Sequence, residues 1–186
     1  MKRNVGEAAL RRFRWVCHIG AWLLFCVLTV ALASARSHDE LCTDVLPSDA
    51  RDTLRTQFPD LYPQKISDHS AEYQEAWLKE HPQECPGIAM GHFQNLSKMS
   101  YAVLLVGSKG SLSGSKLVVM TEGSKGAWKV TKLSEETMAY HYEAVSKLSK
   151  TKSAGALDRI RFKEFDGGAS VYSFAGGRFH KSATKD

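Results

Sequence analysis

Residues 101–133 read YAVLLVGSKGSLSGSKLVVMTEGSKGAWKVTKL, and this stretch decides the fold. Its apolar runs, at 101–106, 116–120 and 127–133, are separated by segments rich in glycine, serine and lysine. The first run is continuously apolar, as expected for a central strand buried on both faces, and the last alternates apolar with polar side chains. Because the connections are short, the runs predict an antiparallel meander.

Further strands are predicted on both sides of this meander. Short apolar or alternating runs bounded by turn residues predict strands at 88–93, 158–165, 170–174 and 178–181. Candidate hairpin turns are Asp166-Gly167-Gly168 and Gly176-Gly177. Residues 134–150 stay open between helix and strand, although helical spacing recurs there at Met138, Tyr142, Val145 and Leu148.

The segment before the meander predicts helices. Pro47–Phe58 opens with a proline, which suits a first helical turn, and its apolar residues recur at helical spacing. Ser70–Glu80 has a partial apolar face and is followed by Pro82. Residues 36–46 are polar and are predicted as a loop, and 60–68 as a connection.

These elements predict an α+β domain. N-terminal helices would pack on an antiparallel β-sheet or meander of about five to seven strands. The core is expected to include Leu54, Phe58, Trp77, Ile88, Tyr101, Val103, Leu105, Val118, Trp128 and Val130.

The first 35 residues have the layout of a secretory signal peptide. A basic start is followed by residues 15–35, which carry no charge until Arg36, and small residues end the run. Both Ala33 and Ala35 close a small-x-small pattern and are the candidate cleavage positions. We therefore expect an exported protein, periplasmic or extracellular, whose domain spans residues 36–186. The alternative is an uncleaved anchor at 15–35, which is long enough to cross a bilayer.

Net charge is set largely by this leader. The chain has 25 basic and 20 acidic residues, and the leader holds 5 and 1 of them, which leaves 20 and 19. The remaining charge is uneven: residues 36–86 carry a net −6 in a predicted helical part, and 87–186 a net +7 in a β-rich part. A nearly neutral domain does not favour a nucleic-acid partner. The basic part could meet an acidic partner, or its field could be cancelled by the acidic part.

Only Cys42 and Cys85 remain after the leader. In an oxidising compartment such a pair usually forms a disulfide, and this one would close a loop of about 44 residues. The two cysteines cannot complete a structural zinc site, and their surroundings do not show the spacing of one.

No catalytic or metal-binding motif stands out. The histidines are scattered singly, the loop 107–116 lacks the spacing of a phosphate-binding loop, and no cofactor is expected. We therefore expect a non-enzymatic binding protein with a protein or cell-envelope partner, in contact with a membrane only if the leader is retained. The alternative is an exported hydrolase assembled from scattered histidine and acidic residues, with His92 and His141 as candidates.

Two stretches resemble the hairpins of known proteins. Gly87-Ile-Ala-Met-Gly91-His-Phe93, with Tyr101–Val106, resembles the hairpin of FG-GAP-like repeats and of small, uncharacterised bacterial exported proteins with a Cys-Pro-Gly entry. The ending, 171–179, is similar to the closing hairpin of those exported proteins. The resemblance implies a β-rich exported fold. Calcium binding does not carry over, because Lys98 stands in the turn where the repeats place acidic ligands.

Overall fold

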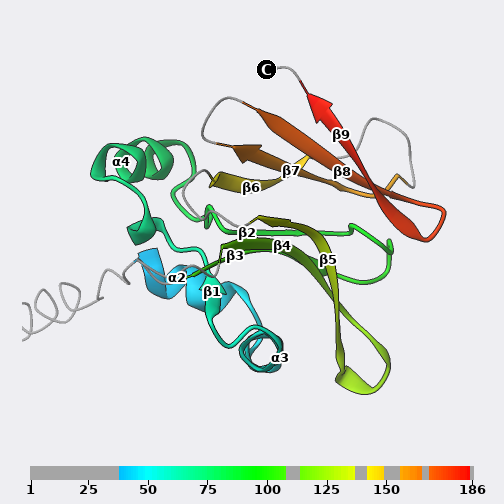
Figure 1. Cartoon of the computed structure of the whole chain (residues 1–186). Helices are drawn as coiled ribbons and strands as arrows, with labels where there is room; N and C mark the ends of the chain where they lie inside the picture. The colour runs from blue at the N-terminus through cyan, green and yellow to red at the C-terminus, as the bar shows by residue number, and fades with distance from the viewer. Residues whose placement is uncertain (1–37, 108–113, 137–141, 149–155, 165–167, 185–186) are drawn as a thin grey trace, which may run out of the picture. The chain divides into compact units, whose positions relative to one another are not determined.

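Antiparallel strands make up most of the structure. The computed structural model describes residues 38–107, 114–136, 142–148, 156–164 and 168–184. Within these residues nine strands form two antiparallel sheets, and the rest includes a few short helices (Figure 1). The sequence therefore predicted a β-rich antiparallel fold correctly, but it did not predict the division of the strands into two sheets.

The first sheet is built around the predicted meander. Its path is β1-β3-β4-β5, and β2 pairs with β3 beside β1. The strands are β1 (Leu61–Pro63), β2 (Ile88–Gly91), β3 (Ser100–Gly107), β4 (Ser115–Glu122) and β5 (Trp128–Glu136). We call this sheet A.

The second sheet is a simple up-and-down meander, which we call sheet B. Its order is β6-β7-β8-β9, so β6 and β9 form its edges. The strands are β6 (Tyr142–Leu148), β7 (Arg159–Glu164), β8 (Ala169–Ala175) and β9 (Arg178–Thr184). The helical spacing in 134–150 was therefore misleading: β5 continues to Glu136 and β6 follows, while 137–141 lie outside the described residues.

The helices precede the meander. They are α2 (His38–Val45), α3 (Ser48–Gln57) and α4 (Ala71–Glu80). The α3 and α4 helices match the predicted ranges, and Ser70 caps α4 by accepting a hydrogen bond from the Tyr73 backbone N–H. The loop predicted at 36–46 was wrong, because α2 occupies most of it. Asp39 and Glu40 lie in its first turn, where carboxylates favour a helix N-terminus.

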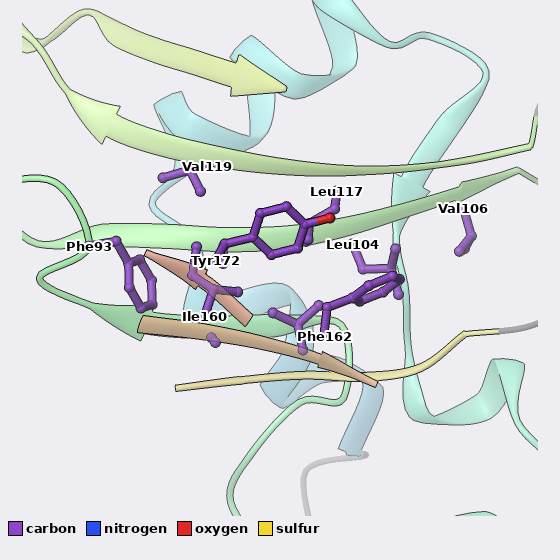
Figure 2. Packing of buried hydrophobic residues seen from close by; sticks show 11 residues of the cluster. Phe93, Leu104, Val106, Leu117, Val119, Ile160, Phe162 and Tyr172 are labelled. Atoms are coloured by element: carbon purple, nitrogen blue, oxygen red, sulfur yellow. The ribbon is translucent and has the colours of Figure 1, made fainter. Parts of the chain in front are cut away.

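One buried cluster joins the two sheets. Figure 2 shows Ile160, Phe162 and Tyr172 of sheet B among side chains of sheet A. The fully buried members from sheet A and its connections include Phe93, Ala102, Leu104, Leu117 and Val119. Strands that alternate in this way bury one face against the opposite sheet, so the two sheets share one core.

A second buried cluster lies on the other face of sheet A. It contains the alternate residues Val103, Leu105, Val118 and Met120 together with Cys42, Leu46, Ala50 and Leu54 from the helical segment. The continuous apolar run at 101–106 is explained by these two clusters, since β3 is buried on both faces.

Most of the predicted core belongs to this second cluster. Leu54, Ile88, Val103, Leu105 and Val118 are buried, and four others pack against them, namely Phe58, Tyr101, Trp128 and Val130. Trp77 was wrongly predicted, because α4 has no buried residue. Its ring stacks between Tyr73 and His81, with centroids 6.0 and 4.3 Å away.

Candidate functional site

A cleft of about 610 Å³ opens between the two sheets. Its lining comes from β5 of sheet A, from β8 and β9 of sheet B, and from the 94–98 turn and the end of β4. A cavity of this size is in the range that binds small molecules or a peptide segment. The two sheet edges β5 and β9 therefore border this opening.

The side of the cleft formed by sheet B is aromatic. Tyr172, Phe174 and Phe179 all line it. The rings of Phe174 and Phe179 meet edge to face at 5.0 Å between centroids, and these residues are direct partners across the β8–β9 pair. Tyr172 is 2% exposed and also belongs to the core between the sheets, so the core packing fixes this wall.

Five cationic side chains surround these aromatic rings. They are Lys98, Lys129, Lys132, Arg178 and Lys181, and all five residues are exposed. The only carboxylate among the described lining residues is Glu122. The Lys181 ammonium lies 6.0 Å from the Tyr172 ring centroid, the outer limit of a cation–π contact. The cleft is therefore strongly positive and partly apolar.

Backbone and side-chain hydrogen bonds fix the 94–98 turn at one end of the cleft. Lys98 Nζ donates to the carbonyl oxygen of Glu122 at 3.0 Å. Thr121 Oγ1 donates to Gln94 Oε1 at 2.5 Å and lies 3.0 Å from Ser100 Oγ. These contacts hold the turn against the end of β4.

The charge of Lys132 is partly neutralised by Glu135. This carboxylate pairs with both Lys116 and Lys132. Hydrogen bonds from these two ammonium groups, Lys116 first, and their charges lower the pKa of Glu135 from 4.5 to about 2. Lys129 and Arg178 form no ion pair within the described residues, so they keep their full charge for a ligand.

The lowered pKa of Glu135 predicts a pH effect. Its pairing contributes stability above pH 4.5, and this contribution is lost as the pH falls from 4.5 to about 2. Glu135→Gln should therefore lose stability less steeply than the wild type in this window, as measured by urea unfolding at a series of pH values. Glu80→Gln, at an exposed position of α4, is the control and should keep the wild-type slope. Parallel curves for Glu135→Gln and the wild type would contradict the pairing.

Of the two candidate histidines of a hydrolase, only His92 can be placed. Its ring nitrogen Nδ1 lies 3.0 Å from the carbonyl oxygen of Lys98. His141 lies outside the described residues. The nearby carboxylate, Asp158, bonds the backbone of His92 and not its ring: the His92 N–H donates to Asp158 Oδ2 at 2.8 Å. The structure thus does not show these two histidines together.

The Asp158 contact ties the segment after β2 to the segment before β7. Asp158 is 7% exposed, and its own N–H donates to the His92 carbonyl at 3.1 Å. A Cβ at position 91 would lie 3.1 Å from Asp158 Oδ2 and 2.8 Å from the Phe93 ring, so the close approach requires Gly91. This link could not be predicted from the sequence, because residues 91 and 158 are far apart in the chain.

Asp158→Ala should lower the free energy of unfolding by about 2 kcal/mol, because it leaves the partly buried His92 N–H without its acceptor. Asp158→Asn keeps an oxygen acceptor and should lose about half as much or less. Urea unfolding of both variants measures the difference. Equal losses in the two variants would show that the hydrogen bond to His92 is not what stabilises this junction.

The predicted disulfide pair is joined in the structure. Cys42 of α2 and Cys85 form a disulfide with a Cα–Cα distance of 5.3 Å. The candidate cleavage positions Ala33 and Ala35 lie outside the described residues.

A second cavity, of about 450 Å³, lies among α2, α3 and β1. It is mostly apolar, with Arg51, Arg55 and Lys65 among its lining residues. Arg51 donates to the carbonyl of Thr43 at 2.7 Å, and Arg55 lies 3.4 Å from Asp52. Burial, followed by the hydrogen bond to Asp68, raises the pKa of the lining residue Tyr62 to about 12. Because Arg51 and Arg55 already have partners, this cavity attracts an anion less than the cleft does.

Among the described residues, no three histidine, cysteine, aspartate or glutamate side chains come close enough to hold a metal ion. None of the described helices combines the length and the apolar character needed to span a membrane. Comparison with protein-family models, with curated proteins and with solved structures finds no match to this chain.

Proposed function

We propose that this chain is an exported, non-enzymatic binding protein whose cleft between the two sheets takes an anionic ligand with apolar parts. The observation that carries the proposal is the lining of the cleft: five cationic side chains and three aromatic rings with a single carboxylate. Charges of one sign gathered in a concave site concentrate and orient a ligand of the opposite sign. Aromatic side chains beside them add apolar contact area.

The kind of lining favours binding over catalysis. Its described residues include no histidine or cysteine, and Glu122 is the only carboxylate among them. Lysine and arginine side chains at the edges of a site typically raise the association rate and select the charge of the partner. A cationic cleft also agrees with the acidic partner that was expected for the basic, β-rich part of the chain.

In the proposed architecture α2 and α3 form a layer on the outer face of sheet A. The buried cluster of Leu46, Ala50 and Leu54 with β3 and β4 supports this arrangement. The acidic helical part would then lie on the opposite side of sheet A from the cleft. Its negative charge would be kept away from the ligand by the thickness of the sheet.

Export is supported by the leader-like first 35 residues and by the Cys42–Cys85 disulfide, since disulfides persist in oxidising compartments. N-terminal sequencing of the exported protein should begin at Ser34 or Arg36. A start at Met1 would instead support the membrane-anchored alternative.

The direct test is binding of a fluorescein-labelled hexa-aspartate peptide, followed by fluorescence anisotropy at low salt. We compare the double variant Lys129→Glu/Lys181→Glu with the matched control Lys79→Glu/Lys147→Glu. The two variants change net charge equally, but both control lysines are exposed and lie outside the cleft. Two lysine–aspartate attractions, each worth about 1 kcal/mol in water, become repulsions in the cleft variant. This variant should therefore lose about tenfold or more in affinity for the peptide.

The control variant should stay within about threefold of the wild type, because distant surface charges are screened. Equal losses in both double variants would show that the peptide responds to net charge and not to the cleft. Absence of binding to the wild type at low salt would overturn the proposal.

A further inference from the structure

The edge of sheet B beside the cleft has backbone groups that could pair with another strand. β9 is the outermost strand of its sheet, and no described strand pairs with its outer side (Figure 1). All of its residues except Phe179 are exposed, over a strand that spans Arg178–Thr184. An edge of this kind presents backbone N–H and C=O groups that another strand can pair with.

The hairpin turn decides which of these groups point outward. The two-residue turn Gly176-Gly177 has positive φ at both positions, 57° and 79°, as a type I′ turn requires. The flanking pair Ala175 and Arg178 is then hydrogen-bonded, and hydrogen-bonded pairs alternate along the ladder. The backbone N–H and C=O groups therefore bond to β8 at four residues, namely Arg178, His180, Ser182 and Thr184. The backbone groups of Phe179, Lys181 and Ala183 point outward.

The same alternation places the side chains of these outward-bonding residues. Phe179 and Lys181 lie opposite Phe174 and Tyr172, and all four line the cleft. Of the three residues whose backbone groups point outward, Phe179 and Lys181 thus also line the cleft. A strand added along β9 would direct every second side chain into the same cationic and aromatic space.

We propose that the ligand of the cleft is an acidic segment of another protein, which binds in extended form as an added antiparallel strand on β9. This inference rests on the proposed function, since it uses the same cleft. Charge complementarity identifies the occupant: β9 carries Arg178 and Lys181 and no acidic residue. A second copy of β9 is disfavoured as the partner, because pairing would bring like charges together across the strands.

The geometry gives the sequence pattern of the segment. A residue opposite Lys181 in an antiparallel pair exchanges both backbone hydrogen bonds with it and points its side chain to the same face. The acidic residues of the segment should therefore be the ones whose N–H groups donate to β9. The intervening residues should point away from the cleft, with N–H groups that do not contact the protein.

This pattern can be tested with an alternating aspartate–valine peptide of about eight residues, which matches the length of an ordinary strand. One derivative is N-methylated at each aspartate and the other at each valine. Methylation removes the donor and blocks the approach of a neighbouring strand on that side only. Strand addition predicts that the aspartate-methylated peptide binds about tenfold or more weakly, whereas the valine-methylated peptide stays within about threefold of the parent.

Equal affinities of the two methylated peptides would overturn strand addition. The hexa-aspartate measurement separates this failure from failure of the proposed function. If the binding of hexa-aspartate still depends on Lys129 and Lys181 while methylation has no selective effect, only the proposal of strand addition on β9 is wrong. If no acidic peptide binds the wild type, both proposals fail.

Discussion

Phe162→Ala is expected to lower the free energy of unfolding by about 3–5 kcal/mol, the range for removing a buried phenylalanine side chain. Phe162 is 1% exposed and comes from β7, an interior strand of sheet B. Its side chain lies in the cluster that joins the sheets (Figure 2). The truncation therefore removes apolar contacts to both sheets and leaves a cavity between them.

Urea unfolding of wild type and variant measures this loss. Leu96→Ala is the control, because Leu96 is 45% exposed and its truncation should change the free energy by less than about 0.5 kcal/mol. A loss below about 1 kcal/mol for Phe162→Ala would contradict a shared core. The test matters for function, because the cleft exists only if the two sheets are held together beside it.

Removing the disulfide is the second large change. Cys42 and Cys85 are 43 positions apart, and a cross-link over such a loop stabilises a fold by about 3–4 kcal/mol through the entropy of the unfolded chain. The double variant Cys42→Ala/Cys85→Ala should lose about this amount. Substitution is preferable to a reductant, because Cys17 and Cys26 are also present in the full chain.

Circular dichroism and urea unfolding of the double variant measure the loss. Cys17→Ala/Cys26→Ala is the matched control and should leave the unfolding of the domain unchanged. An unchanged midpoint in Cys42→Ala/Cys85→Ala would show that the bridge does not constrain the unfolded chain. Both sulfur atoms belong to the buried cluster on the outer face of sheet A, so loosening is expected there first.

The sequence predicted well the elements whose signal is local. Residues 116–120 and 127–133 form β4 and β5, and Gly176-Gly177 forms the β8–β9 turn. A proline marked the start of α3, and Pro82 marked the end of α4. Each of these features depends on a few neighbouring residues, and periodicity or turn chemistry detects such features directly.

Elements whose pattern is interrupted were missed. In β6 the register shifts between Tyr142 and Ala144, so positions 142 and 145 pair with Glu164 and Phe162, which are only two residues apart on β7. Because the bulge places positions three apart on the same side of the strand, the apolar residues here fit a helical spacing as well as a strand. The α2 helix is short and polar, and the disulfide and the packing of Cys42 and Leu46 hold it in place.

The cleft could not be located from the sequence alone. The excess of basic residues in 87–186 was visible, but Lys129 and Lys181 are far apart in the chain. Both line the cleft because β5 and β9 are edges of two different sheets that share a core. This proximity depends on the tertiary structure and has no local signal in the sequence. Since sheet B was not predicted as a separate layer, most of the core between the sheets was also missed.

The most direct test of the cleft is a map of the residues that an acidic peptide touches. Hexa-aspartate is titrated into the isotope-labelled protein while its backbone amide signals are followed by nuclear magnetic resonance. The account predicts that the signals of Lys129, Thr131, Phe179 and Lys181 shift most, while those of α3 and α4 do not move. Shifts centred on Arg51, Arg55 and Lys65, or no shifts at all, would contradict it.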